Sequence, residues 1–147
     1  MALQKDWKEF LELLNAHGVE YVLVGAFAFA YHAHPRFTGD LDVLVRSSGD
    51  NAARVLRVIH EFGFRSLPFA PEDFLTPGRV VQLGHSPIRI DVMNSVDGVS
   101  FDEVWAGRVT TQLDGVPVAL IGRDELIRNK RAAGREKDLA DLRELGA

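Results

Sequence analysis

The sequence of 147 residues contains no cysteine, so it can form no disulfide and offers no thiolate as a nucleophile or a metal ligand. It also lacks a long apolar run: the longest, residues 21–31, is far too short to cross a bilayer. The net charge of −4 excludes a global basic field, so a nucleic-acid substrate would need a local patch. Charged residues within positions 1–10 argue against a signal peptide. We therefore expect a cytoplasmic protein with no membrane partner.

The overall amino-acid composition is that of an ordinary globular domain. Hydrophobic residues make up 46% of the sequence and charged residues 26%. This length allows one compact core but leaves no room for a second of full size. The sequence shows no internal repeat, low-complexity tract or linker. We predict a single domain over residues 1–147.

Hydrophobic periodicity predicts helices and strands that interleave along the chain. Helices are expected at 4–17, 26–34, 48–62, 101–105 and 124–145, the last with a break near Gly134. Strands are expected at 20–24, 40–46, 79–83, 88–93, 109–113 and 116–121, the last four as two hairpins with turns at 84–87 and 114–115. Residues 67–78 hold three prolines and predict an irregular loop, whose Phe69 and Phe74 could line a substrate cleft. The predicted fold class is α/β (α+β), with a mixed sheet flanked by helices and with C-terminal helices.

Two aspartates in an otherwise apolar strand are the most informative feature. Because side chains alternate along a strand, Asp40 and Asp42 point to the same face while Leu41 enters the core. At roughly 4 Å and an effective dielectric constant near 20, two such carboxylates repel by on the order of 4 kcal/mol. Asp91 adds a third carboxylate in a similar apolar strand, where aspartate is disfavoured. A bound Mg²⁺ ion would explain this pattern, because Mg²⁺ binds carboxylates together with substrate phosphates.

Each aspartate taken alone has an ordinary structural explanation. Asp40 could be a turn residue, and Asp42 could lie on a solvated edge. Asp91 could pair with Arg89 or with Arg79. The joint pattern of the three carboxylates favours a site over these separate explanations.

A glycine turn precedes the aspartates by fifteen residues. The predicted strand at 20–24 runs into Gly25 and Ala26 and then into a helix. Glycine lets the backbone approach a ligand closely, and a helix N-terminus offers free N–H groups to an anion. A single glycine at such a turn more often reflects packing, so the turn supports the site only together with the aspartates.

A strand, a Gly–small-residue turn and a helix, then an Asp-x-Asp strand and a separate third aspartate strand, resemble the nucleotidyltransferase superfamily of DNA polymerase β. The segment 34–42, HPRFTGDLD, is similar to the minimal prokaryotic branch found in abortive-infection and toxin–antitoxin systems. The segments 126–130, LIRNK, and 134–142, GREKDLADL, resemble the closing helices of that branch. The resemblance covers essentially the whole chain and implies the nucleotidyltransferase fold.

The resemblance also implies roles for individual residues. Asp40 and Asp42 would hold two Mg²⁺ ions, with Mn²⁺ as the other suitable ion, while Asp91 would share one ion and act as the base. The remaining candidates would bind the nucleotide or the acceptor: Gly25, Ala26, Arg36, Thr38, Lys130, Arg135 and Lys137. For the basic residues among them the alternative is a solvated helix face, with Lys137 pairing with Asp138 or Asp141.

The leading hypothesis is a nucleotidyltransferase that moves a nucleoside monophosphate from a nucleoside triphosphate (NTP), such as ATP, to a hydroxyl of tRNA, a protein or a small molecule. Such a chain could belong to a toxin–antitoxin or phage-defence system, and could need a protein partner or a second copy to complete its cleft. Ala26 departs from the Gly-Gly or Gly-Ser turn usual in the family. The alternatives are therefore a catalytically weak binding module that acts as a partner subunit, and a structural domain with solvent-facing aspartates.

Overall fold

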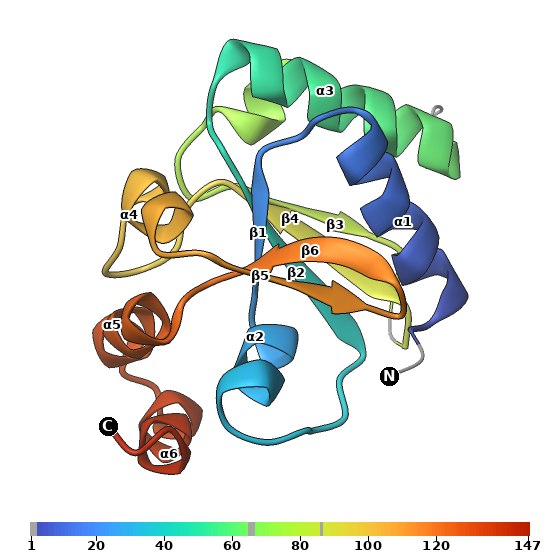
Figure 1. Cartoon of the computed structure of the whole chain (residues 1–147). Coiled ribbons are helices and arrows are strands. Elements are labelled where there is room, and N and C mark those ends of the chain that lie inside the picture. Colours follow the sequence, from blue (N-terminus) through green and yellow to red (C-terminus); the bar gives the residue numbers. More distant parts are fainter. Residues whose placement is uncertain (1–2, 65–66, 86) are drawn as a thin grey trace.

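The computed structural model describes residues 3–64, 67–85 and 87–147 (Figure 1). Its α-helices are α1 (Lys5–Ala16), α2 (Ala26–His32), α3 (Gly49–Ile59), α4 (Phe101–Ala106), α5 (Arg123–Ala133) and α6 (Glu136–Glu144). Its strands are β1 (Tyr21–Val24), β2 (Asp40–Val45), β3 (Val80–Leu83), β4 (Arg89–Met93), β5 (Val109–Leu113) and β6 (Val116–Leu120). Every predicted helix and strand is present, with bounds that differ by a few residues.

The described strands form one six-stranded sheet in the order β3-β4-β2-β1-β6-β5. The neighbours β2 and β4, and likewise β1 and β6, run parallel, whereas β1 and β2 run antiparallel. The pairs β3–β4 and β5–β6 are antiparallel hairpins, as predicted. The predicted turn at 84–87 includes Ser86, which lies outside the described residues. The sheet is therefore mixed, and the expected α+β class is confirmed.

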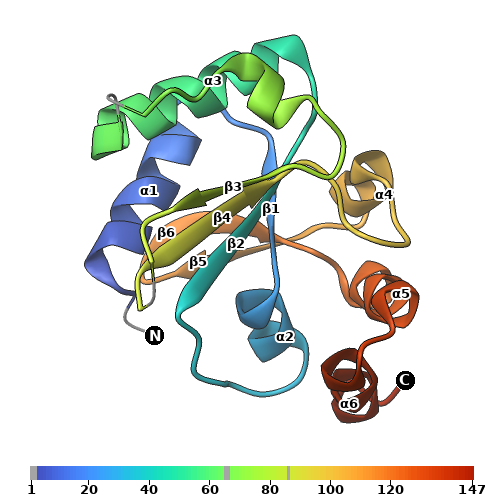
Figure 2. The same ribbon diagram turned by 180° about the vertical axis from the view of Figure 1, so that it is seen from behind.

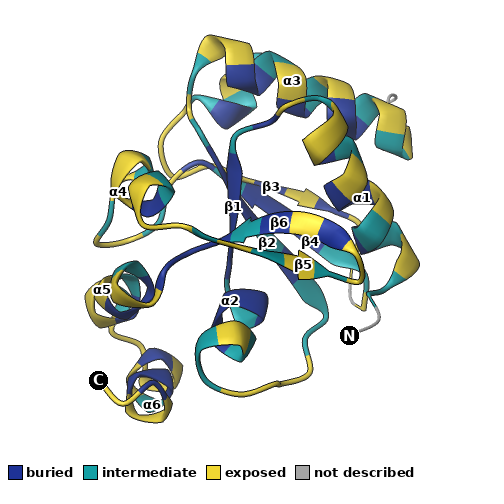
Figure 3. Ribbon diagram, in the orientation of Figure 1, coloured by how far each residue is buried: buried dark blue, intermediate teal, exposed yellow. Residues whose placement is uncertain are grey.

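Helices cover both faces of the sheet (Figure 2). The side chains of β2 alternate between the two layers that pack on these faces. Leu41, Val43 and Val45 of β2 join the core beneath α1 and α3. Leu44 of the same strand joins the core formed with α2, α4, α5 and α6. The helices are exposed on their outer faces and buried toward the sheet (Figure 3). Asp40 and Asp42 consequently share the face that carries α2 and α5.

The helix α3 is shorter than its apolar pattern suggested. Ser48 caps it by accepting a hydrogen bond from the backbone N–H of Asn51, as expected for a serine at this position. The α-helix ends at Ile59, and a wider π-type turn continues over His60–Phe64. Gly63 has a φ of 113°, which a side chain rarely tolerates, so glycine ends the helical run here.

The proline-rich segment contains a short 3₁₀ turn at Pro71–Phe74. A carboxylate oxygen of Asp73 accepts a hydrogen bond of 2.8 Å from the backbone N–H of Ala70, which closes the turn. Phe74 is only 1% exposed within the core beneath α3, and Phe69 packs against the same core. The prediction that Phe74 lines a substrate cleft is therefore wrong, because the turn directs its ring inward. For Phe69, which is half-buried, it stays a prediction.

The C-terminal region divides into two helices as predicted. Gly134 adopts the left-handed conformation with a φ of 62°, and its N–H caps α5 by donating to the carbonyl of Lys130. The described part of the chain holds no helix long and apolar enough to span a bilayer.

Candidate active site

The three aspartates meet on two neighbouring parallel strands. The register pairs Asp42 of β2 with Asp91 of β4, and Asp40 with Arg89. Residues two apart on a strand share a face, so the three carboxylates and Arg89 line the same side of the sheet. Asp40 and Asp42 thus share a face of β2, as predicted from the alternation of side chains, and Asp91 of β4 lies on the same face.

Gly25 lies directly over Asp42, at the end of β1. Its φ of 72° is a conformation that favours glycine. A Cβ atom placed on Gly25 would overlap Oδ2 of Asp42 and lie 3.0 Å from its carboxyl carbon. Both backbone conformation and space thus require glycine here, and the turn is built around the carboxylate.

Arg89 pairs with Asp91 through two hydrogen-bonding nitrogens. Nε lies 3.0 Å from Oδ1 of Asp91, and Nη2 lies 2.8 Å from Oδ2. The same Nε is 3.5 Å from Oδ1 of Asp40. Arg79 pairs instead with Asp73 at 2.6 Å, so of the two possible partners of Asp91 the structure selects Arg89. The hydrogen bonds to Asp91 raise the pKa of Arg89 above its ordinary value.

The negative charges of Asp42 and Asp40 are less well neutralised by neighbouring groups than that of Asp91. Burial raises the pKa of Asp42 to about 6, and the nearby charges of Asp91 and Asp40 act in the same direction. Oδ1 of Asp40 is buried and has no hydrogen-bond partner. Nε of Arg89 lies 3.5 Å from this oxygen but donates its hydrogen to Asp91, so a bound cation would satisfy an oxygen that otherwise accepts no hydrogen bond.

The side chains within the described residues do not form a ready-made cluster of three metal ligands. Arg89 occupies both oxygens of Asp91. Asp40 and Asp42 do fit a hard cation, because they are carboxylates on one face of β2, the ligand type that Mg²⁺ binds, and Oδ1 of Asp40 accepts no hydrogen bond. Completing the site with Asp91 would require Arg89 to release at least one oxygen.

Two adjoining cavities open over the carboxylates, with volumes of about 540 Å³ and about 200 Å³. They share Gly25, Asp40, Asp42, Lys130 and Lys137. The larger one also contains Asp91 and Arg135, and the smaller one Ala26, Arg36 and Thr38. All ten residues predicted for the site thus line one continuous region, although they come from segments up to about a hundred positions apart.

An ion cluster around two buried carboxylates holds most of the predicted basic residues. Lys130 donates to Asp141 at 2.7 Å, and Arg36 reaches the other oxygen of Asp141 at 2.6 Å. Arg135 pairs with Asp138 at 2.7 Å, and Lys130 lies 3.7 Å from Asp138. The two carboxylates are 6% and 2% exposed. Burial raises the pKa of Asp141, but the hydrogen bonds from Arg36 and Lys130 outweigh it and hold the pKa below its usual range.

Lys137 and Thr38 differ from the residues of that cluster. Lys137 is exposed and forms no ion pair with the described residues, so its expected pairing with Asp138 or Asp141 is absent. Its charge nevertheless lowers the pKa of Asp42. Thr38 Oγ1 accepts from the backbone N–H of Asp40 at 3.1 Å and donates to its carbonyl at 3.0 Å. Thr38 therefore orders the entry into β2.

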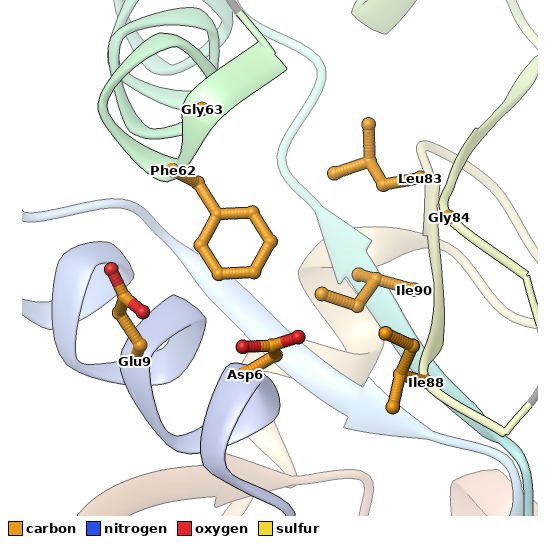
Figure 4. Close-up of a pocket in the computed structure, with 8 residues that line it drawn as sticks. All are labelled: Asp6, Glu9, Phe62, Gly63, Leu83, Gly84, Ile88 and Ile90. Carbon is orange, nitrogen blue, oxygen red and sulfur yellow. The ribbon is translucent and has the colours of Figure 1, made fainter.

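A separate cavity of about 250 Å³ lies on the opposite face of the sheet, between α1 and the β3–β4 hairpin. Asp6 and Glu9 of α1 face apolar side chains there, including Phe62 and Ile90 (Figure 4). None of the predicted site residues lines this cavity. Ile90 points to this face whereas its neighbour Asp91 points to the other, so the sheet separates the two regions.

Similar solved structures share this fold. A nucleotidyltransferase candidate from Thermotoga maritima has a TM-score of 0.65 at 15% identity, covering 95% of this chain and 89% of that one. The lincosamide antibiotic adenylyltransferase LnuA with lincomycin bound has a TM-score of 0.61 at 12% identity, covering 99% and 98%. An antigenic nucleotidyltransferase-like protein from Paracoccidioides brasiliensis has a TM-score of 0.53 at 14% identity, covering 95% and 72%. At these identities the likeness concerns the fold alone.

No curated protein matches the sequence significantly. Residues 3–147, which are nearly the whole chain, match the family described as nucleotidyl transferase of unknown function (DUF2204). The match covers nearly all of the chain and the fold agrees with it, so the chain belongs to this nucleotidyl transferase family.

Proposed function

We propose that this chain is a metal-dependent nucleotidyltransferase that moves a nucleoside monophosphate from an NTP to a hydroxyl acceptor. One arrangement carries the proposal: Asp42 is paired in register with Asp91, and its carboxylate packs so closely against Gly25 that any Cβ there would overlap it. A structural domain with solvent-facing aspartates would need neither the glycine conformation nor the shared orientation. Placing three like charges together also costs free energy, which a substrate-bound cation would offset.

In this proposal Asp40 and Asp42 hold two Mg²⁺ ions, or Mn²⁺ ions, and Asp91 shares one of them. When bound, the ions would stabilise charge on the attacking and leaving oxygens at the α-phosphate. The support comes from Oδ1 of Asp40, which is buried without a hydrogen bond, and from the raised pKa of Asp42; a bound cation would stabilise both carboxylates in the ionised form. Carboxylates with phosphate oxygens are the usual ligand set of Mg²⁺.

Asp91 is the proposed base. The acceptor oxygen would form a bond to the α-phosphorus while the bond from that phosphorus to the bridging oxygen breaks, and pyrophosphate would leave. The hydroxyl proton would pass to an oxygen of Asp91. Because Arg89 donates to both oxygens, one of its hydrogen bonds must open before this transfer.

The phosphate contacts divide between backbone and side chains. The turn at Gly25 and Ala26 lines the smaller cavity together with Asp40 and Asp42, and its N–H groups would bind the phosphates. Lys137 is the strongest cationic candidate, since it lines both cavities and forms no ion pair within the described residues. Lys130, Arg36 and Arg135 would act less directly, because each already pairs with a buried carboxylate.

The acceptor remains open among tRNA, a protein and a small molecule, and so does a place in a toxin–antitoxin or phage-defence system. The likeness to LnuA, whose structure contains lincomycin, makes a small hydroxylated molecule a specific candidate. LnuA is covered almost end to end by this chain, so a fold of this size can present a site to a small molecule. A protein partner or a second copy could complete the cleft for a larger acceptor.

The test is transfer of label. The protein would be incubated with Mg²⁺, each α-labelled NTP and a cell extract, and the labelled acceptor identified. We expect one class of acceptor to take the label, Asp42→Asn to abolish the transfer, and Asp50→Asn, an exposed change on α3, to leave it intact. Absence of label together with absence of a nucleotide-dependent thermal shift would overturn the proposal.

The second candidate is a binding module with a weakened site. Two observations favour it: Ala26 lacks the hydroxyl of a Gly-Ser turn, and Arg89 occupies both oxygens of Asp91. Such a module would show a thermal shift with nucleotide but would transfer no label to any acceptor in a cell extract. Ala26→Ser would then be the informative variant, because a gain of transfer would identify the turn as the cause.

A further inference from the structure

Phe37 is an exposed ring at the edge of the active-site region. It is 89% exposed, the highest value among the large apolar side chains that the structure describes as exposed. It lies in the segment between α2 and β2, and it lines the smaller cavity together with Asp40 and Asp42. A ring in this position contributes almost no burial to the fold, so packing gives no reason for a phenylalanine here.

The backbone on both sides of Phe37 is tied to the rest of the domain. Arg36 pairs with Asp141 at 2.6 Å, and its guanidinium carbon lies 3.6 Å from the centre of the Phe29 ring. Thr38 is held by its two hydrogen bonds to the backbone of Asp40. The side chains at 36 and 38 are thus engaged by the domain, whereas the ring between them faces solvent at the cavity.

The chemistry around the ring defines what it would contact. The smaller cavity combines the carboxylates proposed to hold metal ions with Lys130 and Lys137, so a phosphorylated ligand is expected beside it. Aromatic faces next to cations that follow a phosphate backbone are the common means of binding nucleotides, because every base offers a π-face for stacking. An apolar peptide would not suit walls with this charge.

We propose that Phe37 is a stacking platform for a nucleobase at the mouth of the active site. This inference rests on the proposed function and adds the residue that holds the base. The base has two sources that share one chemistry: the NTP donor itself, or a nucleotide of a nucleic-acid acceptor.

The test compares Phe37→Ala, Phe37→Leu and Phe37→Trp in the full chain, with Mg²⁺ present. Equilibrium binding would be measured for an NTP, for a short single-stranded RNA and for inorganic tripolyphosphate, which has no base. We expect Phe37→Ala to weaken binding of one base-bearing probe about tenfold, or about 1.4 kcal/mol, without affecting tripolyphosphate. Phe37→Leu should lose as much as Phe37→Ala, and Phe37→Trp should bind at least as tightly as the native chain.

Tyr31 provides the matched control. It is also an exposed aromatic residue, at 53%, but it lines neither active-site cavity. Tyr31→Ala should change no binding constant, and all variants should unfold at nearly the native temperature because both rings are exposed.

The outcomes separate the sources of the base. A loss for the NTP identifies the donor base, and a loss for RNA alone identifies an acceptor base. Equal affinities of the native chain and Phe37→Ala for both probes would refute the platform, as would full retention by Phe37→Leu or a change of oligomeric state in Phe37→Ala. If the native chain binds neither an NTP nor RNA, the proposed function fails first and the platform with it.

Discussion

Asp42 is expected to destabilise the folded chain at neutral pH when no cation is bound. Its pKa rises from 3.8 to about 6 on folding, chiefly through burial and secondarily through Asp91 and Asp40. Each tenfold change in proton affinity corresponds to about 1.36 kcal/mol, so the ionised form costs roughly 3 kcal/mol. Asp42→Asn removes that charge and keeps the shape of the side chain. The variant should therefore be more stable than the native chain at pH 7 while losing transferase activity.

The raised pKa of Asp42 determines how the unfolding free energy changes with pH. Between the unfolded pKa near 4 and the folded pKa near 6, the folded chain holds a proton on Asp42 that the unfolded chain has released. Stability from this group therefore falls as the pH rises through that window, and the full cost persists above it. The difference in unfolding free energy between Asp42→Asn and the native chain should grow from near zero at pH 4 to roughly 3 kcal/mol at pH 7.

Urea denaturation at several pH values, without divalent cations, measures this difference. Taking the difference between variant and native chain cancels other groups that titrate at low pH, such as Asp138 and Asp141, whose pKa values are lowered. Asp50→Asn, in the exposed first turn of α3, is the control and should show only a small difference, because a charge at an exposed helix N-terminus contributes about 0.3–1 kcal/mol. A flat difference for Asp42→Asn, or one that decreases toward pH 7, would refute the assignment of Asp42 as a reluctantly ionised group.

Two further substitutions test the architecture of the site. Gly25→Ala should abolish nucleotide-dependent thermal shift and destabilise the chain by about 1–2 kcal/mol, because its Cβ overlaps the Asp42 carboxylate at a φ that only glycine adopts easily. Lys130→Met should lower the unfolding free energy by up to about 3 kcal/mol, since Asp141 keeps only Arg36 as its partner. Calorimetry checks both, and native stability in Gly25→Ala or in Lys130→Met would contradict the corresponding contact.

The arrangement of helices and strands could be predicted from the sequence because the local signals agree with the global fold. Apolar residues at helical spacing predicted α1, and Trp7, Phe10 and Leu14 are indeed buried. Alternation in β2 correctly placed Asp40 and Asp42 on the face opposite Leu41. Here each residue's environment depends on neighbours within a few positions, which is the range over which periodicity is informative.

Other features depend on contacts between distant segments. Phe74 looked like a loop residue because prolines surround it, but a capped 3₁₀ turn places it in the core. The pairing of Arg36 with Asp141 joins residues that are 105 positions apart, so helix periodicity in α6 could not identify the partner. The pairing of Arg89 with Asp91 could be predicted in part, because a cation two positions before Asp91 on a strand must share its face.

The roles of the basic side chains and of bound metal ions follow from the charge balance at the site. A triphosphate approaching Asp40, Asp42 and Asp91 meets a surface on which the carboxylates outnumber Arg89, so its binding is unfavourable unless further positive charge arrives with it. The ion cluster supplies little of that charge, because two of its three cations, Arg36, Lys130 and Arg135, are balanced by Asp138 and Asp141. The remaining positive charge and that of Lys137 only offset the excess of carboxylates at the site, so none is left over for the triphosphate. In the proposed function, bound cations would then serve nucleotide binding as well as the chemical step, and the net charge of −4 would be no obstacle to a nucleotide substrate.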